Sequence, residues 1–527
     1  MKGVIPVQSR WFPVVLIAIG FLLRLWMAHA FFLNPDEAYH YLLSAEPSLR
    51  LVYQASLTTA HPPLYLVLLH YWALLGNSEF VLRMLSLGAS MGFYWLAFLW
   101  VCRALDRNVA VMVLALLLFS PPLISISWEI RQYAILWFFA MGGLYSLECG
   151  VENRSVPWMA LSAASLWLAL VTHYSSLILA VGTGVYAALR LWQTKNRLPV
   201  IAVWAAGQGI GLALGAFLLK THVAMLRNRG VTQALADTYV RKSMFHPGEE
   251  GLLHFIARAN IRLFHYFFAQ GAVGVVGLLL FVAGLVILLR AHTDPETRRR
   301  RQALACLLGL PFVLNCAMAI YGLFPYGGTR QNSYLALFAM TGIAAAASAW
   351  NVRKWVPTAA LAAVLLLVNL FPSVMGERFR REDHTRQHMT EAIADLRGSL
   401  APGSVIFTDE QGRFVLSYYL CRSNRLPYGG IEPPFVEATC SDYRMISIRP
   451  SKWIFDAADF PQEVRGLGET FRLEPATQVW FFQAGWSVDD EPGLRALLPR
   501  YGCVQPREFG RNIVQCPISL AESRVSE

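Results

Sequence analysis

The sequence predicts a polytopic α-helical membrane protein with about 11 transmembrane helices and a soluble α/β domain at its C-terminal end. Of the 527 residues, 55% are hydrophobic and only 15% are charged, and the mean hydropathy is +0.42. Soluble proteins usually carry about 25% charged residues. The long apolar runs end before residue 376. We therefore predict a membrane domain over residues 1–375 and a second domain over residues 376–527.

The membrane domain contains eleven apolar runs that are long enough, at about 20 residues each, to cross a bilayer. The first run follows Lys2 and Arg10, and residues 28–30 resemble a signal-peptide cleavage site. We predict that it is retained as the first span, because it is long and contains Arg24. The shorter apolar stretch His61–His70 is predicted as a helix in the outer interface. The eleven runs lie near residues 11–31, 79–102, 108–127, 131–149, 157–173, 174–193, 199–219, 268–290, 302–322, 331–349 and 354–373.

The distribution of Lys and Arg predicts the orientation, because cytoplasmic connections carry an excess of both. The short connections on the opposite side hold mainly Arg50, Arg131 and Arg330. We therefore expect the N-terminus in the cytoplasm, and an odd number of spans then places residues 376–527 outside. The residues of the basic set are Lys2, Arg10, Arg103, Arg107, Arg154, Arg190, Lys195, Arg197, Arg290, Arg298 to Arg301, Arg353 and Lys354.

The net charge of +11 is accounted for by cytoplasmic loops and by contact with anionic membrane lipids, so we expect no nucleic-acid partner. An outer loop over residues 220–267 also has a basic excess. Two interpretations stay open for this loop. It is either a solvated face beside anionic lipids or a gate over a pocket for a phosphate-bearing lipid.

In the C-terminal domain, strands are predicted at residues 404–408, 443–448 and 478–482, and helices at residues 383–400 and 409–420. The domain contains four cysteines. An even number of cysteines indicates disulfides when a domain faces an oxidising compartment. We favour the pairs Cys421–Cys440 and Cys503–Cys516, and the sequence leaves three connectivities open.

Candidate functional residues gather at the span ends that are predicted to face outward. Asp36 and Glu37 follow the first span, in a sequence that also suits a helix start. Charged residues at a membrane are costly to keep and tend to mark a function. The other motifs are His61-Pro-Pro-Leu-Tyr in the first outer loop (residues 32–78), Ser78-Glu79-Phe80-x-x-Arg83, Glu129-x-Arg131-x-Tyr133-Ala134, Thr172-His173-Tyr174 and Tyr326-Gly327-Gly328-Thr329-Arg330.

These residue types indicate the transfer of a sugar from a lipid phosphate. Negative charge grows on the phosphate as the sugar–oxygen bond breaks, so a cation is needed there. Arg131 and Arg330 are the best candidates for this cation. They lie on the side of the membrane where basic residues are predicted to be rare, and a guanidinium group fits a phosphate. Arg83 is a further candidate. The acceptor hydroxyl needs a base, which we assign to Asp36 or Glu37, and a single displacement inverts the configuration.

Structural interpretations stay open beside these roles. Glu129 and Arg131 could form an interfacial ion pair. Arg83 could pair with Glu79. A divalent metal ion is a possible cofactor with Asp36 as its first ligand, although no spacing requires one. The residues assigned to substrate binding are His61, Glu129, Tyr133, His173 and Tyr174, of which the histidines could also be hydrogen-bonding residues at helix ends.

Taken in this order, the motifs resemble bacterial glycosyltransferases of the GT-C fold. They are most similar to the branch of protein O-mannosyltransferases and aminoarabinose transferases, over roughly residues 10–350. The resemblance implies an enzyme of the bacterial inner membrane that uses a polyprenyl-phosphate-linked sugar at the periplasmic face. It also implies that Asp36 is the base or orients the acceptor, and that Arg131 and Arg330 face the donor phosphate.

Residues 376–527 match no motif of the better-known members, so the acceptor stays open among protein Ser/Thr, lipid A, an exopolysaccharide or another cell-envelope lipid. A transporter or flippase for a lipid-linked glycan is the main alternative. It predicts charged residues near mid-membrane and repeated halves, whereas the polar residues here gather at one face and no repeat is evident. A non-catalytic assembly subunit is a second alternative.

Overall fold

In the computed structural model, the chain divides into two compact units. The first comprises Met1–Trp26, Ser56–Tyr65 and Arg83–Phe379, and the second comprises Met27–Ala55, Leu66–Leu82 and Arg380–Glu527. The structure describes residues 11–192, 198–225, 240–290, 294–349, 385–421 and 434–521, with short gaps at 441, 450–451, 475–476, 486–487 and 489–491.

The chain is a multi-pass membrane protein. Within the described ranges, six helices are long and apolar enough to cross a membrane. They are α1 (Phe12–Ala30), α5 (Glu79–Ala104), α8 (Tyr133–Glu152), α11 with the π-helical turn η2 (Leu198–Val223), α15 (Gly271–Leu289) and α16 (Pro295–Ile320). The shorter apolar helices are α4 with η1 (Leu64–Leu75), α6 (Arg107–Leu118), α9 (Val156–Leu170), α10 (Ser176–Trp192) and α17 (Leu335–Ala349).

Each of the first ten predicted spans contains one of these helices, and the run at 354–373 lies outside the described residues. The predicted span 108–127 is wrong as a single helix. The chain there forms α6 and then α7 (Pro121–Ile126), with Phe119 and Ser120 between them. Pro121 and Pro122 explain the break, because proline cannot donate the backbone hydrogen bond that would continue α6.

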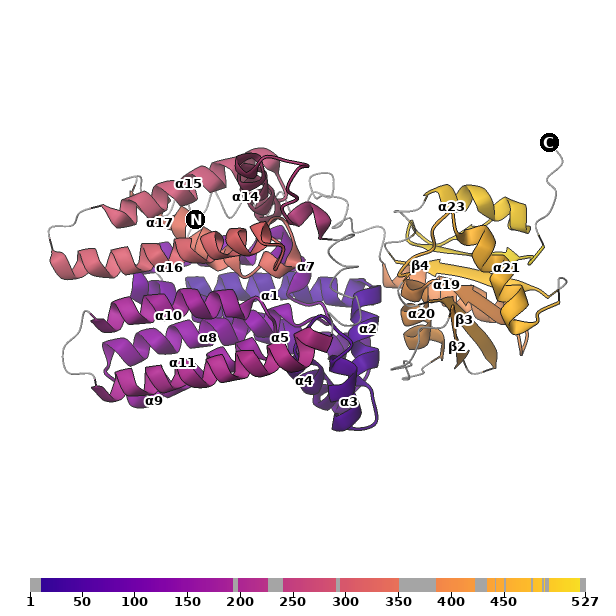
Figure 1. The fold of residues 1–527 in the computed structure, drawn as a ribbon, viewed down its shortest axis with the longest axis horizontal. Coiled ribbons are helices and arrows are strands. Elements are labelled where there is room, and N and C mark those ends of the chain that lie inside the picture. Colours follow the sequence, from indigo (N-terminus) through magenta and orange to yellow (C-terminus); the bar gives the residue numbers. More distant parts are fainter. Residues whose placement is uncertain are drawn as a thin grey trace, which may run out of the picture. The chain divides into compact units, whose positions relative to one another are not determined.

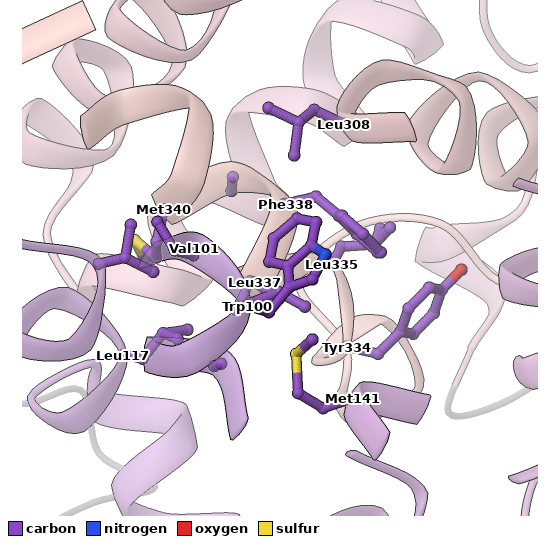
Figure 2. Close-up of a cluster of buried hydrophobic side chains, with 14 of the residues drawn as sticks. Trp100, Val101, Leu117, Met141, Leu308, Tyr334, Leu335, Leu337, Phe338 and Met340 are labelled. Atoms are coloured by element: carbon purple, nitrogen blue, oxygen red, sulfur yellow. The ribbon is translucent and has the colours of Figure 1, made fainter. Parts of the chain in front are cut away.

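Helix packing forms the core of the first unit. Helices α8, α9, α10 and α11 run side by side (Figure 1). Trp100 of α5 is fully buried in a cluster with Leu117 of α6, Met141 of α8 and Phe338 of α17 (Figure 2). A Cβ atom on Gly284 of α15 would clash with the backbone carbonyl oxygen of Gly342 in α17. Small residues at such a contact let two helix backbones approach closely.

The first unit also contains α14 (Leu252–Phe268), which covers the last third of the predicted outer loop and packs against α15. An ion pair between Arg258 of α14 and Glu250 orders the chain just before this helix, with 2.6 Å between Nη2 and Oε1. The predicted loop 220–267 is therefore helical over its last third. Residues 226–239 of that loop lie outside the described residues.

The second unit contains a six-stranded sheet in the order β2-β3-β1-β4-β6-β5. Strand β1 pairs in parallel with β3 and β4, and the other neighbouring strands pair antiparallel. The three predicted strands fall on β1, β3 and β4. The strands are β1 (Val405–Thr408), β2 (Phe435–Cys440), β3 (Tyr443–Ile448), β4 (Val479–Ala484), β5 (Arg507–Glu508) and β6 (Ile513–Ile518), and the main helices are α19 (Arg386–Ser399), α20 (Glu410–Leu416), α21 (Phe460–Phe471) and α23 (Pro492–Leu497).

Both faces of this sheet are buried. Side chains alternate along β1, so Val405 and Phe407 join one apolar cluster and Ile406 joins the other. The first cluster includes residues of α21, and the second includes residues of α19 and α20. Two disulfides, Cys421–Cys440 and Cys503–Cys516, join the pairs that the sequence favours.

The first outer loop differs from its predicted place in the membrane domain. From the sequence, residues 32–78 are predicted to belong to that domain, whereas the structure places Met27–Ala55 and Leu66–Leu82 in the second unit. Packing explains the difference, because Phe32 is only 2% exposed within the cluster formed by α19 and α20. Helix α2 (Pro35–Ser44) also packs against α20, and α3 (Leu49–Ser56) follows it.

Candidate functional site

A buried turn between α7 and α8 carries Glu129 and Arg131, which are 3% and 7% exposed. The backbone N–H of Arg131 donates to the carbonyl oxygen of Glu129 at 2.7 Å. The carbonyl oxygen of Arg131 accepts a hydrogen bond from the Ser86 hydroxyl of α5 at 3.3 Å. The backbone of this turn is therefore fixed both by its own hydrogen bond and by α5.

Glu129 also connects this turn to Arg330. The Arg330 Nη1 atom lies 3.4 Å from Glu129 Oε2. Arg330 begins a short 3₁₀ turn, η4 (Arg330–Asn332), and the Asn332 amide donates to the carbonyl oxygen of Pro325 at 3.0 Å. The ion pair thus brings the predicted donor-phosphate residue Arg330 to the turn that carries Arg131.

Aromatic rings surround the same turn. The imidazole rings of His61 and His173 stack with 5.4 Å between their centroids, and the Tyr133 ring lies 5.3 Å from His173. The Arg131 guanidinium carbon lies 5.6 Å from the centroid of Tyr133. The first unit therefore gathers six residues predicted from the sequence, namely His61, Glu129, Arg131, Tyr133, His173 and Arg330.

His173 lies in the turn between α9 and α10, where its surroundings keep it neutral. Its Nδ1 atom accepts the backbone N–H of Ser175 at 3.1 Å, which assigns the ring proton of the neutral form to Nε2. Burial, with a further contribution from the positive charge of Arg131, lowers the pKa of His173 to about 3. At neutral pH the ring therefore adds no positive charge beside Arg131.

The other two predicted residues of this unit have different surroundings. The guanidinium carbon of Arg83 lies 4.5 Å from the ring centroid of Trp128, in a buried cation–π contact. Tyr174 shares its turn with His173. Its hydroxyl is buried and has no hydrogen-bond partner within the described part of the chain, and burial raises its pKa.

Arg24 belongs to this region, although no functional role is predicted for it from the sequence. It is fully buried in α1, and its guanidinium donates to the Ser127 hydroxyl at 2.7 Å and to the Tyr94 hydroxyl at 2.7 Å. It also donates to the carbonyl oxygen of Leu118 at 2.8 Å. Arg24 thus supports the chain just before Glu129. A charge inside an apolar span was the available sequence signal.

Asp36 and Glu37 belong to the second unit, where they begin α2. The Asn34 side chain accepts the backbone N–H of Glu37 at 3.0 Å, and the Glu37 carboxylate accepts the backbone N–H of Asn34 at 3.1 Å. This reciprocal pair is a capping box. Glu37 is fully buried, whereas Asp36 is partly exposed. The two adjacent carboxylates therefore have different surroundings, and Glu37 stabilises the helix start.

Across the ranges that the structure describes, no group of three or more His, Cys, Asp or Glu side chains is arranged to hold a metal ion. Asp36 is the ligand that the sequence favours, and its neighbour Glu37 is engaged in the capping box.

Two solved structures of ArnT from Cupriavidus metallidurans are similar to this chain. The apo state matches with a TM-score of 0.53 and 12% identity, over 96% of this chain and 97% of ArnT. The state bound to undecaprenyl phosphate matches with a TM-score of 0.50 and 14% identity, over 98% of this chain and 100% of ArnT. No protein-family model and no curated protein matches the sequence. ArnT is a glycosyltransferase of the GT-C fold, and the chain shares this fold, as its motifs predict.

Proposed function

We propose that this protein is an inverting glycosyltransferase that moves one sugar from a polyprenyl-phosphate donor to an acceptor in the cell envelope. The observation that carries the proposal is the buried Glu129, which pairs with Arg330 and shares its turn with the buried Arg131 in the first unit. The fold supports it, because ArnT shares this fold and has been solved with undecaprenyl phosphate bound.

Arg131 and Arg330 bind the donor phosphate in this proposal. Their guanidinium groups stabilise the negative charge that develops on the phosphate as the sugar leaves. Glu129 holds Arg330 through the 3.4 Å ion pair. The rings of Tyr133 and His173 lie beside Arg131, with His61 stacked on His173, and the neutral state of His173 avoids a further positive charge there.

Asp36 is the proposed base. It takes the proton of the acceptor hydroxyl while the acceptor oxygen attacks the anomeric carbon, and the bond between that carbon and the phosphate oxygen breaks. The bonding electrons leave with the phosphate. One displacement of this kind inverts the anomeric configuration. Asp36 is preferred over Glu37 because the Glu37 carboxylate already accepts the backbone N–H of Asn34.

The proposed orientation has the N-terminus in the cytoplasm and residues 376–527 in the periplasm. A bacterial inner membrane is the proposed location. The two disulfides of the second unit support this side, because disulfides persist in oxidising compartments. The acceptor is proposed only as an envelope molecule, either protein, lipid A or another glycan.

Donor turnover tests the proposal. The purified full chain in lipid is given a panel of polyprenyl-phosphate sugars and an envelope extract, and release of free polyprenyl phosphate is measured. We expect Asp36→Asn to lower turnover by at least about 100-fold. The matched variant Glu37→Gln keeps a side-chain acceptor for the Asn34 N–H and should retain most of the activity.

Two outcomes would overturn this assignment. If the folded wild type released polyprenyl phosphate from no donor, the enzyme proposal would fail and the transporter alternative would be favoured. If Asp36→Asn and Glu37→Gln lowered turnover equally, Asp36 would not be the base.

A further inference from the structure

The C-terminal part of the second unit contacts the helix that carries Asp36. The Tyr39 ring of α2 lies 4.8 Å from the Phe414 ring of α20, between ring centroids, and 6.0 Å from the Trp453 ring. Residues 36 and 39 are one turn apart on α2 and therefore share a face. The contacts of Tyr39 therefore hold in place the face of α2 that also carries Asp36.

A tyrosine pair makes the second set of contacts. The Tyr419 hydroxyl accepts the backbone N–H of Leu33 at 2.7 Å and donates to the Glu79 carboxylate. The other oxygen of Glu79 lies 3.2 Å from Nε of Arg386. A single hydroxyl group therefore joins the chain just before α2 to Glu79 at the start of α5.

Tyr418 makes a parallel set of contacts. Its hydroxyl donates to the carbonyl oxygen of Asn77 at 2.9 Å, and its ring packs against Tyr41 of α2 with 5.3 Å between centroids. Tyr418 and Tyr419 thus bind both segments of the first outer loop that belong to the second unit.

Both tyrosines lie on a π-helical turn, η6 (Ser417–Cys421), which follows α20. π-Helical turns are rare in proteins, and those that occur often lie at functional sites. Cys421 ends the turn and forms a disulfide with Cys440, the last residue of β2. The disulfide therefore ties the turn that carries the two tyrosines to the edge of the sheet.

A glycine provides a further contact at the end of β4. Gly485 has a φ of +109°, and a Cβ atom there would lie 2.5 Å from Cγ of Pro35, the first residue of α2. The carboxyl ends of parallel strands are where open α/β sheets bind ligands. Here the start of α2 packs against that end of β4.

We propose that the disulfide-closed turn Ser417–Cys421 is a positioning device for the segment that carries Asp36. Tyr419 and Tyr418 are its positioning residues, and the Cys421–Cys440 disulfide holds the turn in place. The consequence for turnover rests on the proposed function, whereas the contact itself does not. A misplacement of about 1 Å at a reacting group can lower a rate 100-fold.

Tyr419→Phe tests the proposal with the loss of one oxygen atom. We expect turnover at saturating donor to fall about 10-fold or more, with the KM for the donor within twofold of the wild type. Because Tyr419 and Glu79 share a hydrogen bond, which an alanine at position 79 cannot make, Tyr419→Phe should cost less in a Glu79→Ala background than in the wild type. Equal costs in the two backgrounds would contradict the proposed connection.

The disulfides provide a matched pair of variants. Cys421→Ser with Cys440→Ser should lower turnover in the same way as Tyr419→Phe. Cys503→Ser with Cys516→Ser removes the other disulfide of the same sheet and should keep turnover within about threefold, because neither cysteine lies on η6. Equal losses in both double variants would overturn the positioning role of the first disulfide.

Hydrogen exchange separates this proposal from the proposed function. Amides of residues 31–45 should exchange faster in Tyr419→Phe and in the Cys421/Cys440 double variant than in the wild type or in the Cys503/Cys516 double variant. Unchanged exchange would overturn the positioning device even if the protein transfers sugars. Faster exchange in a protein whose wild type releases no polyprenyl phosphate would support the device and overturn the glycosyltransferase assignment.

Discussion

The buried His173 makes the stability of the protein depend on pH. Its pKa is about 3 in the folded chain and 6.5 in the unfolded reference, because burial disfavours the charged ring and Arg131 repels it. The unfolded chain therefore takes up a proton first as the pH falls. The contribution of His173 to the free energy of unfolding is therefore fully present above pH 6.5 and is lost as the pH falls toward 3.

The size of the effect follows from these two values. Between pH 7 and pH 5, His173 alone should lower the free energy of unfolding by about 2 kcal/mol, and the limit at low pH is about 5 kcal/mol. His173→Asn removes the titrating group, and its amide oxygen can still accept the Ser175 N–H. From pH 7 to pH 5, the free energy of unfolding of the variant should therefore fall by about 2 kcal/mol less than that of the wild type.

The assay is denaturant unfolding of the full chain in micelles at pH 7 and pH 5, followed by tryptophan fluorescence. Phe324→Leu is the matched control, because Phe324 packs edge-on against His173 at 6.5 Å and its replacement leaves the imidazole in place. This control should show the wild-type dependence on pH. If wild type and His173→Asn lost the same free energy of unfolding from pH 7 to pH 5, the neutral, buried state of His173 would be refuted.

Three further predictions concern the charged groups. Arg24→Met should lower the free energy of unfolding by on the order of 3 kcal/mol, because a buried guanidinium with four hydrogen bonds is lost; denaturant unfolding measures this, and an unchanged midpoint would contradict it. Arg330→Gln should raise the KM for the donor at least about tenfold, and Arg330→Lys should raise it less, because lysine keeps the positive charge. Turnover measured over a range of donor concentrations gives both KM values. If both matched the wild type, Arg330 would not bind the donor phosphate. Treatment with EDTA should leave donor turnover unchanged if arginines supply the charge at the phosphate, whereas a loss that Mg²⁺ restores would show a metal requirement.

The helical part of the fold was predictable because a long apolar run can form only one kind of secondary structure in a membrane. A run of about 20 apolar residues buries its backbone polar groups only as a helix, and each of the ten runs that fall within the described residues overlaps a helix of the structure. The break at Ser120 shows what run length alone misses. Hydropathy does not register that Pro121-Pro122 ends a helix, although the sequence contained that signal.

The candidate site was predictable in its residue types but not in its partners. The charge rule singled out Arg131 and Arg330 because each lies on the side where basic residues are rare. The sequence suggested an ion pair between Glu129 and Arg131, and the structure shows one between Glu129 and Arg330, about 200 residues apart. Such a contact depends on how helices from distant parts of the chain pack, and local spacing contains no information about it.

For the choice between Asp36 and Glu37, in contrast, the local sequence does contain information. Their adjacency gives no preference, and both suit a base. Yet Asn34-Pro35-Asp36-Glu37 contains the spacing of a capping box, an Asn followed three residues later by a Glu. The structure forms that box and buries Glu37 completely. The local sequence thus already favoured a structural use for Glu37, and the chemical role proposed for Asp36 follows from that assignment together with its partial exposure. What the sequence did not contain was the tertiary support of this segment by Tyr419, because a hydrogen bond to Leu33 across 386 residues leaves no local signal.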